Sequence, residues 1–144
     1  MNQRFLDFIP FVLEHEGGEY ENDPDDPGGP TKWGIDHRSH PNVDIRNLTR
    51  DEAVEIYFES YWQPNKCGTL PPKLGESHMD ACVNNGAQRA KKFLAAANGD
   101  ARKYNDERQA FYYRLVEARP TSKKYLKGWL NRLNDLRKWI EKEG

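Results

Sequence analysis

The hydrophobic pattern of the chain is helical over most of its length. Near the N-terminus it predicts an amphipathic helix over residues 3–16, ended by Gly17-Gly18. Pro10 lies in its middle, where a proline either kinks a helix or delays its start. The apolar positions of this helix are Phe5, Leu6, Phe8, Ile9, Val12 and Leu13. Residues 19–46 are rich in Gly, Pro, Asp and Asn, so we expect loops there, with one short hairpin around residues 31–35.

Five more helices follow from the same reasoning. Thr49 and Glu52 form a capping box, which predicts a helix of about three turns that Pro64 stops. A last helix begins after Pro120, with Thr121 or Ser122 as its cap. The others are expected over residues 74–83, 87–97 and 100–118. The pattern therefore predicts an all-α fold, or at most an α+β one, of about six helices with an irregular acidic loop lobe.

The length of 144 residues suits one domain, and we expect a monomer. No apolar run approaches the ~20 residues that span a bilayer, so we expect no stable membrane insertion. Asp7 and Pro10 interrupt any signal-peptide pattern, which predicts a protein that is cytoplasmic as synthesised. Cys67 and Cys82 are expected to be buried thiols. The pair His37 and His40 has no third ligand nearby, so we expect no metal and no cofactor.

The charges are unevenly divided along the chain. Residues 1–85 carry 7 Lys and Arg against 16 Asp and Glu, and residues 86–144 carry 15 against 7. One interpretation is that most of these charges lie on two solvent-exposed faces, one acidic and one basic, and have no further role. The other is that the basic half attracts an anionic polymer, either nucleic acid or a bacterial cell wall with its peptide carboxylates and teichoic acids.

Glu16 is the first candidate for chemistry, because it lies where a helix gives way to a carboxylate-rich loop. A carboxyl group held against apolar residues has its charged form disfavoured and can remain a proton donor. Asp25 and Asp26 lie in the polar loop and should stay ionised, and the hydroxyl of Thr31 could position a water. Such a pair of unlike carboxyl groups is what glycoside hydrolysis requires. A solvated helix end followed by ordinary Asp-Pro turns explains the same residues, so spacing alone leaves both interpretations open.

The segment from Glu16-Gly17-Gly18 through Asp26-Pro27-Gly28-Gly29 to Trp33-Gly34-Ile35 resembles the signature of glycoside hydrolase family 108. The resemblance continues at Tyr61-Trp62, at residues 80–87 and at residues 128–132, so it covers nearly the whole chain. It implies a single lysozyme-like domain over residues 1–144. Within it, residues 1–86 would form the catalytic lobe and residues 87–144 a helical part that resembles a peptidoglycan-binding region.

This resemblance implies an N-acetylmuramidase that cuts the β-1,4 bond between N-acetylmuramic acid and N-acetylglucosamine. Glu16 matches the catalytic acid of the family. For the carboxylate that handles the water, the Asp-Pro-Gly-Gly motif selects Asp26, whereas the distance from Glu16 selects Asp25, and we keep both while favouring Asp26. Thr31 would help to position the water, and the spacing shared with phage-type lysozymes implies inversion.

The residues expected to bind substrate are less specific. Trp33 and Tyr61 could stack on sugar rings, and Trp62 could do so or belong to the core. Polar groups that could hydrogen-bond the sugars are Asp80, Asn84 and Asn85, although an Asn-Asn-Gly sequence at a helix end needs no function. Arg114, Trp129 and Arg132 are expected to close the C-terminal helices instead of contacting substrate.

The partner implied by the resemblance is the glycan strand of peptidoglycan, not nucleic acid. A prophage endolysin, acting on the wall after release through a holin or by another route, fits the lack of an export signal. Two alternatives stay open. One is a lytic transglycosylase, which needs only the acid, and the other is a non-catalytic module that binds the wall or assists secretion.

Overall fold

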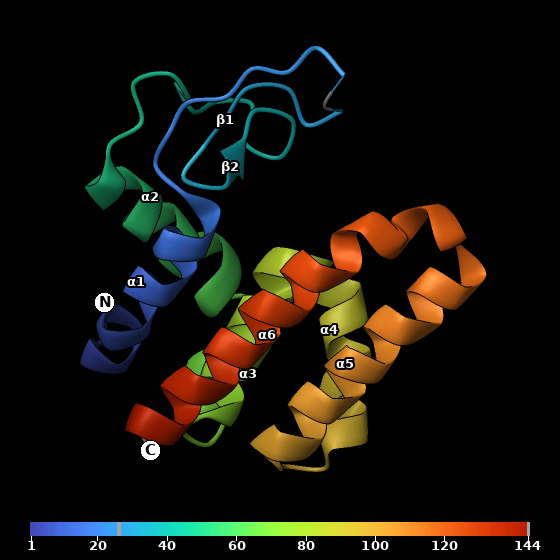
Figure 1. The fold of residues 1–144 in the computed structure, drawn as a ribbon. Coiled ribbons are helices and arrows are strands. Elements are labelled where there is room, and N and C mark those ends of the chain that lie inside the picture. Colours follow the sequence, from blue (N-terminus) through green and yellow to red (C-terminus); the bar gives the residue numbers. More distant parts are fainter. Residues whose placement is uncertain (26, 144) are drawn as a thin grey trace. The chain divides into compact units, whose positions relative to one another are not determined.

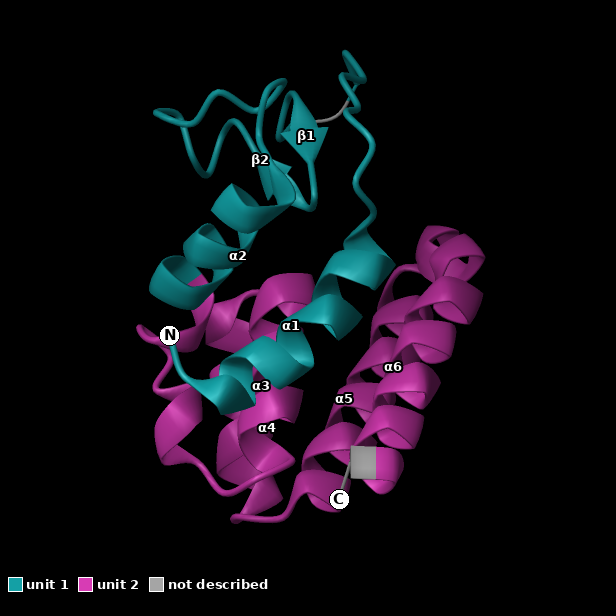
Figure 2. Ribbon diagram, turned by 90° about the vertical axis from the view of Figure 1, so that its left-hand side faces the viewer, with its two compact units in different colours: residues 1–60 teal, residues 61–144 magenta. Residues whose placement is uncertain are grey.

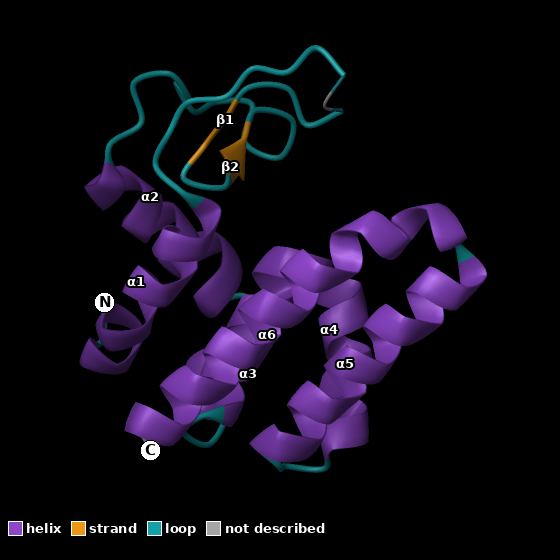
Figure 3. Cartoon of the chain, in the orientation of Figure 1, coloured by secondary structure: helices purple, strands orange, loops and turns teal. Residues whose placement is uncertain are grey.

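The computed structural model describes residues 1–25 and 27–143, and within them six α-helices and one two-stranded antiparallel hairpin (Figure 1). This confirms the predicted, mostly helical fold with a single short hairpin (Figure 3). The elements are α1 Gln3–Glu16, β1 Thr31–Lys32, β2 Ile35–Asp36, α2 Arg50–Tyr57, α3 Leu74–Asn85, α4 Ala87–Ala97, α5 Ala101–Ala118 and α6 Lys123–Glu143. A π-helical turn, Phe58–Trp62, extends α2, and 3₁₀ turns occupy Cys67–Thr69 and Pro120–Ser122.

The chain divides into two compact units, residues 1–60 and residues 61–144 (Figure 2). The first unit holds α1, the long loop segment with the hairpin, and α2. The second unit holds the four helices α3 to α6. These two units are defined by compactness. The expected division by function, into a catalytic lobe over residues 1–86 and a peptidoglycan-binding part over residues 87–144, stays a prediction.

In the first unit, the start of α1 is fixed by its N-cap residue, Asn2. The side chain of Asn2 accepts a hydrogen bond of 2.8 Å from the backbone N–H of Phe5, which satisfies one of the free donors at the helix start. The helix therefore starts at Gln3 and runs through Pro10, which confirms the predicted bounds, and Pro10 does not delay its start. It ends at Glu16, because Gly17 turns to a φ of +79° and donates to the carbonyl of Leu13.

The second helix of this unit has the predicted capping box. The hydroxyl of Thr49 accepts from the N–H of Glu52, and the carboxylate of Glu52 accepts from the N–H of Thr49. These bonds lower the pKa of Glu52. Helical structure continues to Trp62, which agrees with the predicted stop at Pro64.

The second unit is built around an apolar cluster shared by α3, α4 and α5. Its buried members are Leu74, Ala81, Cys82, Ala90, Phe93, Ala97 and Tyr104. The rings of Phe93 and Tyr104 meet edge to face, with centroids 5.8 Å apart. Cys67 and Cys82 are both buried thiols, as the sequence predicted.

A buried charge cluster joins α3, α5 and α6 beside this core. Asp80 has no exposed surface, and its carboxylate pairs with Arg108 at 2.9 Å and with Arg132 at 2.8 Å. Burial by itself raises the pKa of Asp80, but the charges of Arg132 and Arg108 and their hydrogen bonds outweigh it and hold that pKa at about 2. Arg132 thus closes the C-terminal helix onto α3, the role expected for it.

His78 is a second buried titratable group on α3. Its Nδ1 lies 2.8 Å from the hydroxyl of Tyr104, and its Nε2 lies 3.7 Å from the thiol of Cys82. Burial, helped by the charge of Lys91, lowers the pKa of His78 to about 4. Burial also raises the pKa of Cys82 to about 12, so the imidazole and the thiol are both neutral at pH 7.

We predict that acid destabilises the second unit in two steps. Unfolded histidine takes up a proton near pH 6.5 but folded His78 only near pH 4, so its contribution is lost as the pH falls between those values. The contribution of Asp80 is present above its unfolded value of 3.8 and is lost as the pH falls towards 2. Urea unfolding followed by circular dichroism at pH 7 to 2 measures both steps.

Two variants separate the steps. Asp80→Asn should lower the free energy of unfolding at pH 7 by roughly 3–5 kcal/mol, because it leaves two buried guanidinium groups facing a neutral amide. That penalty should shrink below pH 4. His78→Gln should remove the upper step only, and a penalty for Asp80→Asn that stays constant down to pH 2 would contradict the assignment.

Candidate active site

A two-residue turn at the tip of the hairpin organises the first unit. Thr31 pairs with Asp36 and Lys32 with Ile35, which leaves Trp33 and Gly34 as the loop. Their φ angles are +55° and +76°. Positive φ at both loop residues defines a type I′ turn, whose twist matches that of the two strands. The hydroxyl of Tyr57 on α2 donates to the carbonyl of Trp33 at 2.7 Å and fastens the turn.

The side chain of Glu16 lies against this turn. A Cβ added at Gly34 would come within 2.8 Å of Cγ and 2.9 Å of Cβ of Glu16, and it would also meet the hydroxyl of Tyr57. Gly34 is therefore required twice, by its positive φ and by the close approach of Glu16. Because Glu16 is only partly exposed, its carboxyl group is positioned by the hairpin instead of extending freely from a helix end.

Trp33 packs on Gly18, in the glycine pair that directly follows Glu16 in the chain. A Cβ at Gly18 would come within 2.6 Å of two atoms of the indole ring, so the ring lies directly on the backbone at Gly18. Gly17 ends the helix, and Gly18 makes room for the ring. The Glu-Gly-Gly and Trp-Gly parts of the sequence motif thus pack on each other at two places, Gly34 on the side chain of Glu16 and Trp33 on Gly18.

The acidic loop lies between these two parts of the motif. Asp25 is exposed, and its N–H donates to the carboxylate of Asp23 at 2.9 Å in an Asx turn. Asp26, the favoured partner of Glu16, lies outside the described residues. The hydroxyl of Thr31 donates to the carbonyl of Gly29 at 3.1 Å, so its oxygen can still accept a hydrogen bond from a water.

The remaining predicted residues gather in the second unit. The side-chain amides of Asn84 and Asn85 donate to the hydroxyl of Tyr112 at 3.0 and 3.2 Å. Both asparagines are partly exposed, so a contact with substrate is compatible with these bonds. Asp80 has no exposed surface, and a buried carboxylate held by two arginines cannot touch a sugar unless those arginines rearrange. The geometry gives Asp80 a structural role.

Tyr61 and Trp62 differ in their burial. Trp62 is 2% exposed and packs beside Gly68, which places it in the core. Tyr61 is partly exposed, and its carbonyl accepts a hydrogen bond of 2.8 Å from the side chain of Asn65. Of the two aromatic residues, Tyr61 is the one with surface to offer a ligand.

Two important residues were not singled out from the sequence. Tyr57 holds the hairpin turn from 24 positions away, and Arg108 neutralises Asp80 from 28 positions away. Helical periodicity indicates that both positions face inwards, but no local pattern reports which polar group each would reach.

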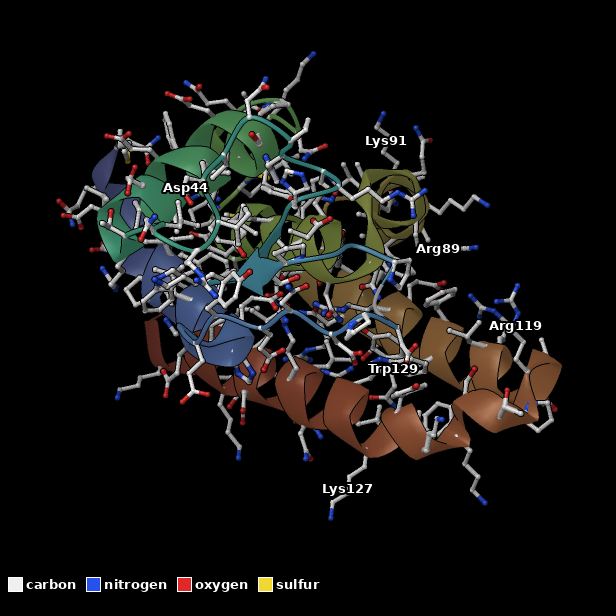
Figure 4. All side chains as sticks on the ribbon, turned by 90° about the horizontal axis from the view of Figure 1, so that it is seen from above. Asp44, Arg89, Lys91, Arg119, Lys127 and Trp129 are labelled. Atoms are coloured by element: carbon white, nitrogen blue, oxygen red, sulfur yellow. The ribbon has the colours of Figure 1, made fainter. Side chains whose placement is uncertain are left out.

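Apart from the buried Arg108 and Arg132, several basic residues of the second unit lie on its outer surface. Lys91 on α4 and Lys127 on α6 project away from the helices, and Arg119 lies where α5 ends (Figure 4). In the described part of the chain, no three His, Cys, Asp or Glu side chains are grouped to hold a metal ion. Nor does any described helix have the length and apolar character needed to cross a membrane.

Comparison with known families decides the affiliation of the chain. A sequence model of the family Glycosyl hydrolase 108 matches residues 9–86, which is more than half of the chain and includes Glu16 and the whole hairpin. The chain belongs to this family. A second model, of a predicted peptidoglycan domain, matches residues 74–134 of this family 108 protein. This chain is thus a glycoside hydrolase that acts on peptidoglycan.

Solved structures share the fold of this family 108 chain. A structure described as that of Brucella abortus SagA is similar with a TM-score of 0.74 and 25% sequence identity. The similarity covers 94% of this chain and 92% of the other. No curated protein matches the sequence.

We predict that Gly34→Ala displaces Glu16, whereas Gly29→Ala does not. Both glycines have a positive φ, so each substitution should cost roughly 1–2 kcal/mol of stability. A methyl group at position 34 also meets Glu16 and Tyr57, and such overpacking costs about 1–3 kcal/mol more. At position 29 the nearest atom is 4.0 Å away. Thermal unfolding together with release of soluble fragments from peptidoglycan measures the difference. Equal losses in the two variants would contradict the packing of Glu16 on the turn.

Proposed function

We propose that this family 108 protein is an N-acetylmuramidase, a lysozyme-type enzyme that hydrolyses the β-1,4 bond between N-acetylmuramic acid and N-acetylglucosamine. One observation carries the proposal. The turn at Trp33 and Gly34 packs on the side chain of the partly exposed Glu16, the indole ring of Trp33 packs on Gly18 two residues further along the chain, and an acidic loop follows in the sequence. A positioned acid, an aromatic surface and nearby carboxylates are the parts that glycoside hydrolysis uses.

In the proposed reaction Glu16 is the general acid. The carboxylic acid form of Glu16 gives its proton to the glycosidic oxygen as the bond to the anomeric carbon breaks. A water attacks that carbon from the opposite face and gives a proton to Asp26 or Asp25. Thr31 supports this step, because its hydroxyl oxygen can accept a hydrogen bond from the same water. The products are a new reducing end and a free hydroxyl group.

The stereochemical outcome follows from the room left for the water. A water between acid and base requires carboxyl groups about 6.5–9.5 Å apart and inverts the anomeric centre. The spacing of Glu16, Asp25 and Thr31 along the chain resembles that of phage-type lysozymes, which favours such a separation. We therefore propose inversion.

The sugar contacts are part of the same proposal. Trp33 offers a partly exposed ring beside Glu16, which suits the apolar face of a pyranose. Tyr61, Asn84 and Asn85 are proposed as further contacts, with aromatic surface from the first and amide groups from the other two. No cofactor takes part in this scheme.

For the cellular role we propose a monomeric prophage endolysin that is made in the cytoplasm and reaches the wall after release through a holin or by another route. The affiliation with family 108 and the match to a peptidoglycan domain support an enzyme that degrades the wall. The endolysin role rests on the resemblance alone.

We predict that Glu16→Gln abolishes the clearing of purified peptidoglycan and leaves the thermal midpoint nearly unchanged. The amide keeps the shape of the side chain on the hairpin turn but has no acidic proton to give. Glu14→Gln is the matched control, because Glu14 lies on the same helix and is exposed. Full activity of Glu16→Gln would remove Glu16 from the mechanism and the proposed function with it.

The same assay separates the two aspartates and the competing reaction. Asp26→Asn should lower the rate by about 10²–10⁴, the usual contribution of a general base, while Asp25→Asn keeps most of it. The reverse result would assign the base to Asp25. Mass spectrometry of the wild-type digest should find reducing ends. Anhydro-muropeptides would instead identify a lytic transglycosylase, and wall binding without any fall in turbidity would identify a non-catalytic module.

A further inference from the structure

A cavity of about 920 Å³ lies in the second unit, and no residue assigned to the reaction is among those that line it. It is formed where α5 begins, where α6 ends and just before α3. The first turns of α5 and the last turns of α6 lie at the same end of this unit (Figure 1). Three cationic and three anionic residues contribute to its wall: Lys73, Arg102 and Arg137, and Asp100, Asp106 and Glu141.

One polar atom in the wall lacks a partner. Asn105 is 2% exposed, and its amide N–H₂ donates to the hydroxyl of Ser77 at 3.2 Å. Its carbonyl oxygen, Oδ1, is buried and accepts no hydrogen bond from any residue that the structure describes. A buried acceptor left unsatisfied is rare and destabilising, and a ligand N–H in the cavity would satisfy it if a rotation of the Asn105 side chain turned Oδ1 towards the ligand.

Half of the charged groups in the wall are already held by the fold. Arg137 donates to Asp106 at 2.8 Å and to Gln109 at 2.6 Å, and Asp100 caps α5 by accepting from the N–H of Arg102. The charges that remain for a ligand are the cations of Lys73 and Arg102 and the carboxylate of Glu141. Arg102 and Asn105 are one turn apart on α5, so they lie on the same face.

This arrangement matches a ligand with both signs of charge. Of the three charges that remain, two are cationic and one is anionic, so a polyphosphate such as teichoic acid would pair with Lys73 and Arg102 but would be repelled by Glu141. A peptide with carboxylates, a free amino group and amide N–H groups has a partner for each feature. Arg102 and Lys73 can take a carboxylate, Glu141 an amino group, and Asn105 an amide N–H.

We propose that this cavity binds the stem peptide of peptidoglycan, through a diamino acid residue that presents a carboxylate and an amino group together. The proposal rests on the proposed function only in taking the wall as the ligand. Arg102 and Asn105 belong to the segment matched by the predicted peptidoglycan domain. The cavity would hold the peptide while the first unit acts on the glycan.

The probe is the synthetic stem peptide L-Ala-γ-D-Glu-meso-diaminopimelyl-D-Ala, titrated into the full wild-type chain by calorimetry. We expect saturable binding with one peptide per chain. The same peptide with its amino groups acetylated should bind on the order of tenfold more weakly, because it no longer pairs with Glu141. A disaccharide without peptide should not compete.

Two substitutions locate the binding. Arg102→Glu should weaken it on the order of tenfold or more, since a cation becomes an anion. Arg114→Glu is the matched control, because Arg114 is an exposed arginine on the same helix outside the cavity, and it should bind as the wild type does. Asn105→Leu removes the acceptor and should also weaken binding, with its thermal midpoint measured alongside.

Absence of saturable binding to the wild type would overturn the proposal, and so would equal affinities of Arg102→Glu and Arg114→Glu. The titration involves no turnover, so it is independent of Glu16. Full lytic activity of Glu16→Gln would remove the proposed reaction and leave the peptide result unaffected, whereas loss of peptide binding would leave the proposed reaction standing.

Discussion

The contact between the hairpin turn and Glu16 is the constraint on which the first unit depends. Two consecutive residues with positive φ bring Gly34 so close to Glu16 that no side chain fits between them. This contact restrains a carboxyl group at a helix end, where side chains are usually mobile. Tyr57 holds the turn from a separate helix, so the position of Glu16 depends on three segments at once. Pre-organisation of this kind is what a general acid requires.

The second unit depends on a different kind of interaction. Asp80 joins α3 to α5 and α6 through two arginines, 28 and 52 positions away in the chain. A buried ion cluster contributes little net stability, because the cost of removing three charges from water offsets most of the attraction. It does penalise any arrangement that leaves one of the charges alone. Its role is therefore to specify one packing of the helices.

Much of the fold could be predicted because its signals are local. The helix over residues 87–97 was predicted with its observed bounds, and the capping box at Thr49 and Glu52 lies where the sequence places it. The first helix also has its predicted bounds. Pro10 does not delay its start, because Asn2 supplies the cap at the beginning of the helix. Local propensity and capping were enough for these elements.

The candidate site was less predictable because its parts meet only in three dimensions. The motif around Glu16 pointed to this residue as the candidate acid, but not to the packing of Trp33 on Gly18 or of Gly34 on Glu16. Asp80 was expected at the substrate, since an Asp between apolar residues of a helix looks the same in sequence whether it faces a groove or two arginines. Only the long-range pairing distinguishes the two cases.

The backbone at Trp33 has a consequence for engineering. A bulky residue at a φ of +55° is strained, and asparagine adopts that conformation more readily. Asparagine there would relax the hairpin and raise the melting temperature, but it would remove the ring beside the acid. Selection for thermal stability alone would therefore favour asparagine at this position, at the expense of the aromatic surface proposed to contact a sugar.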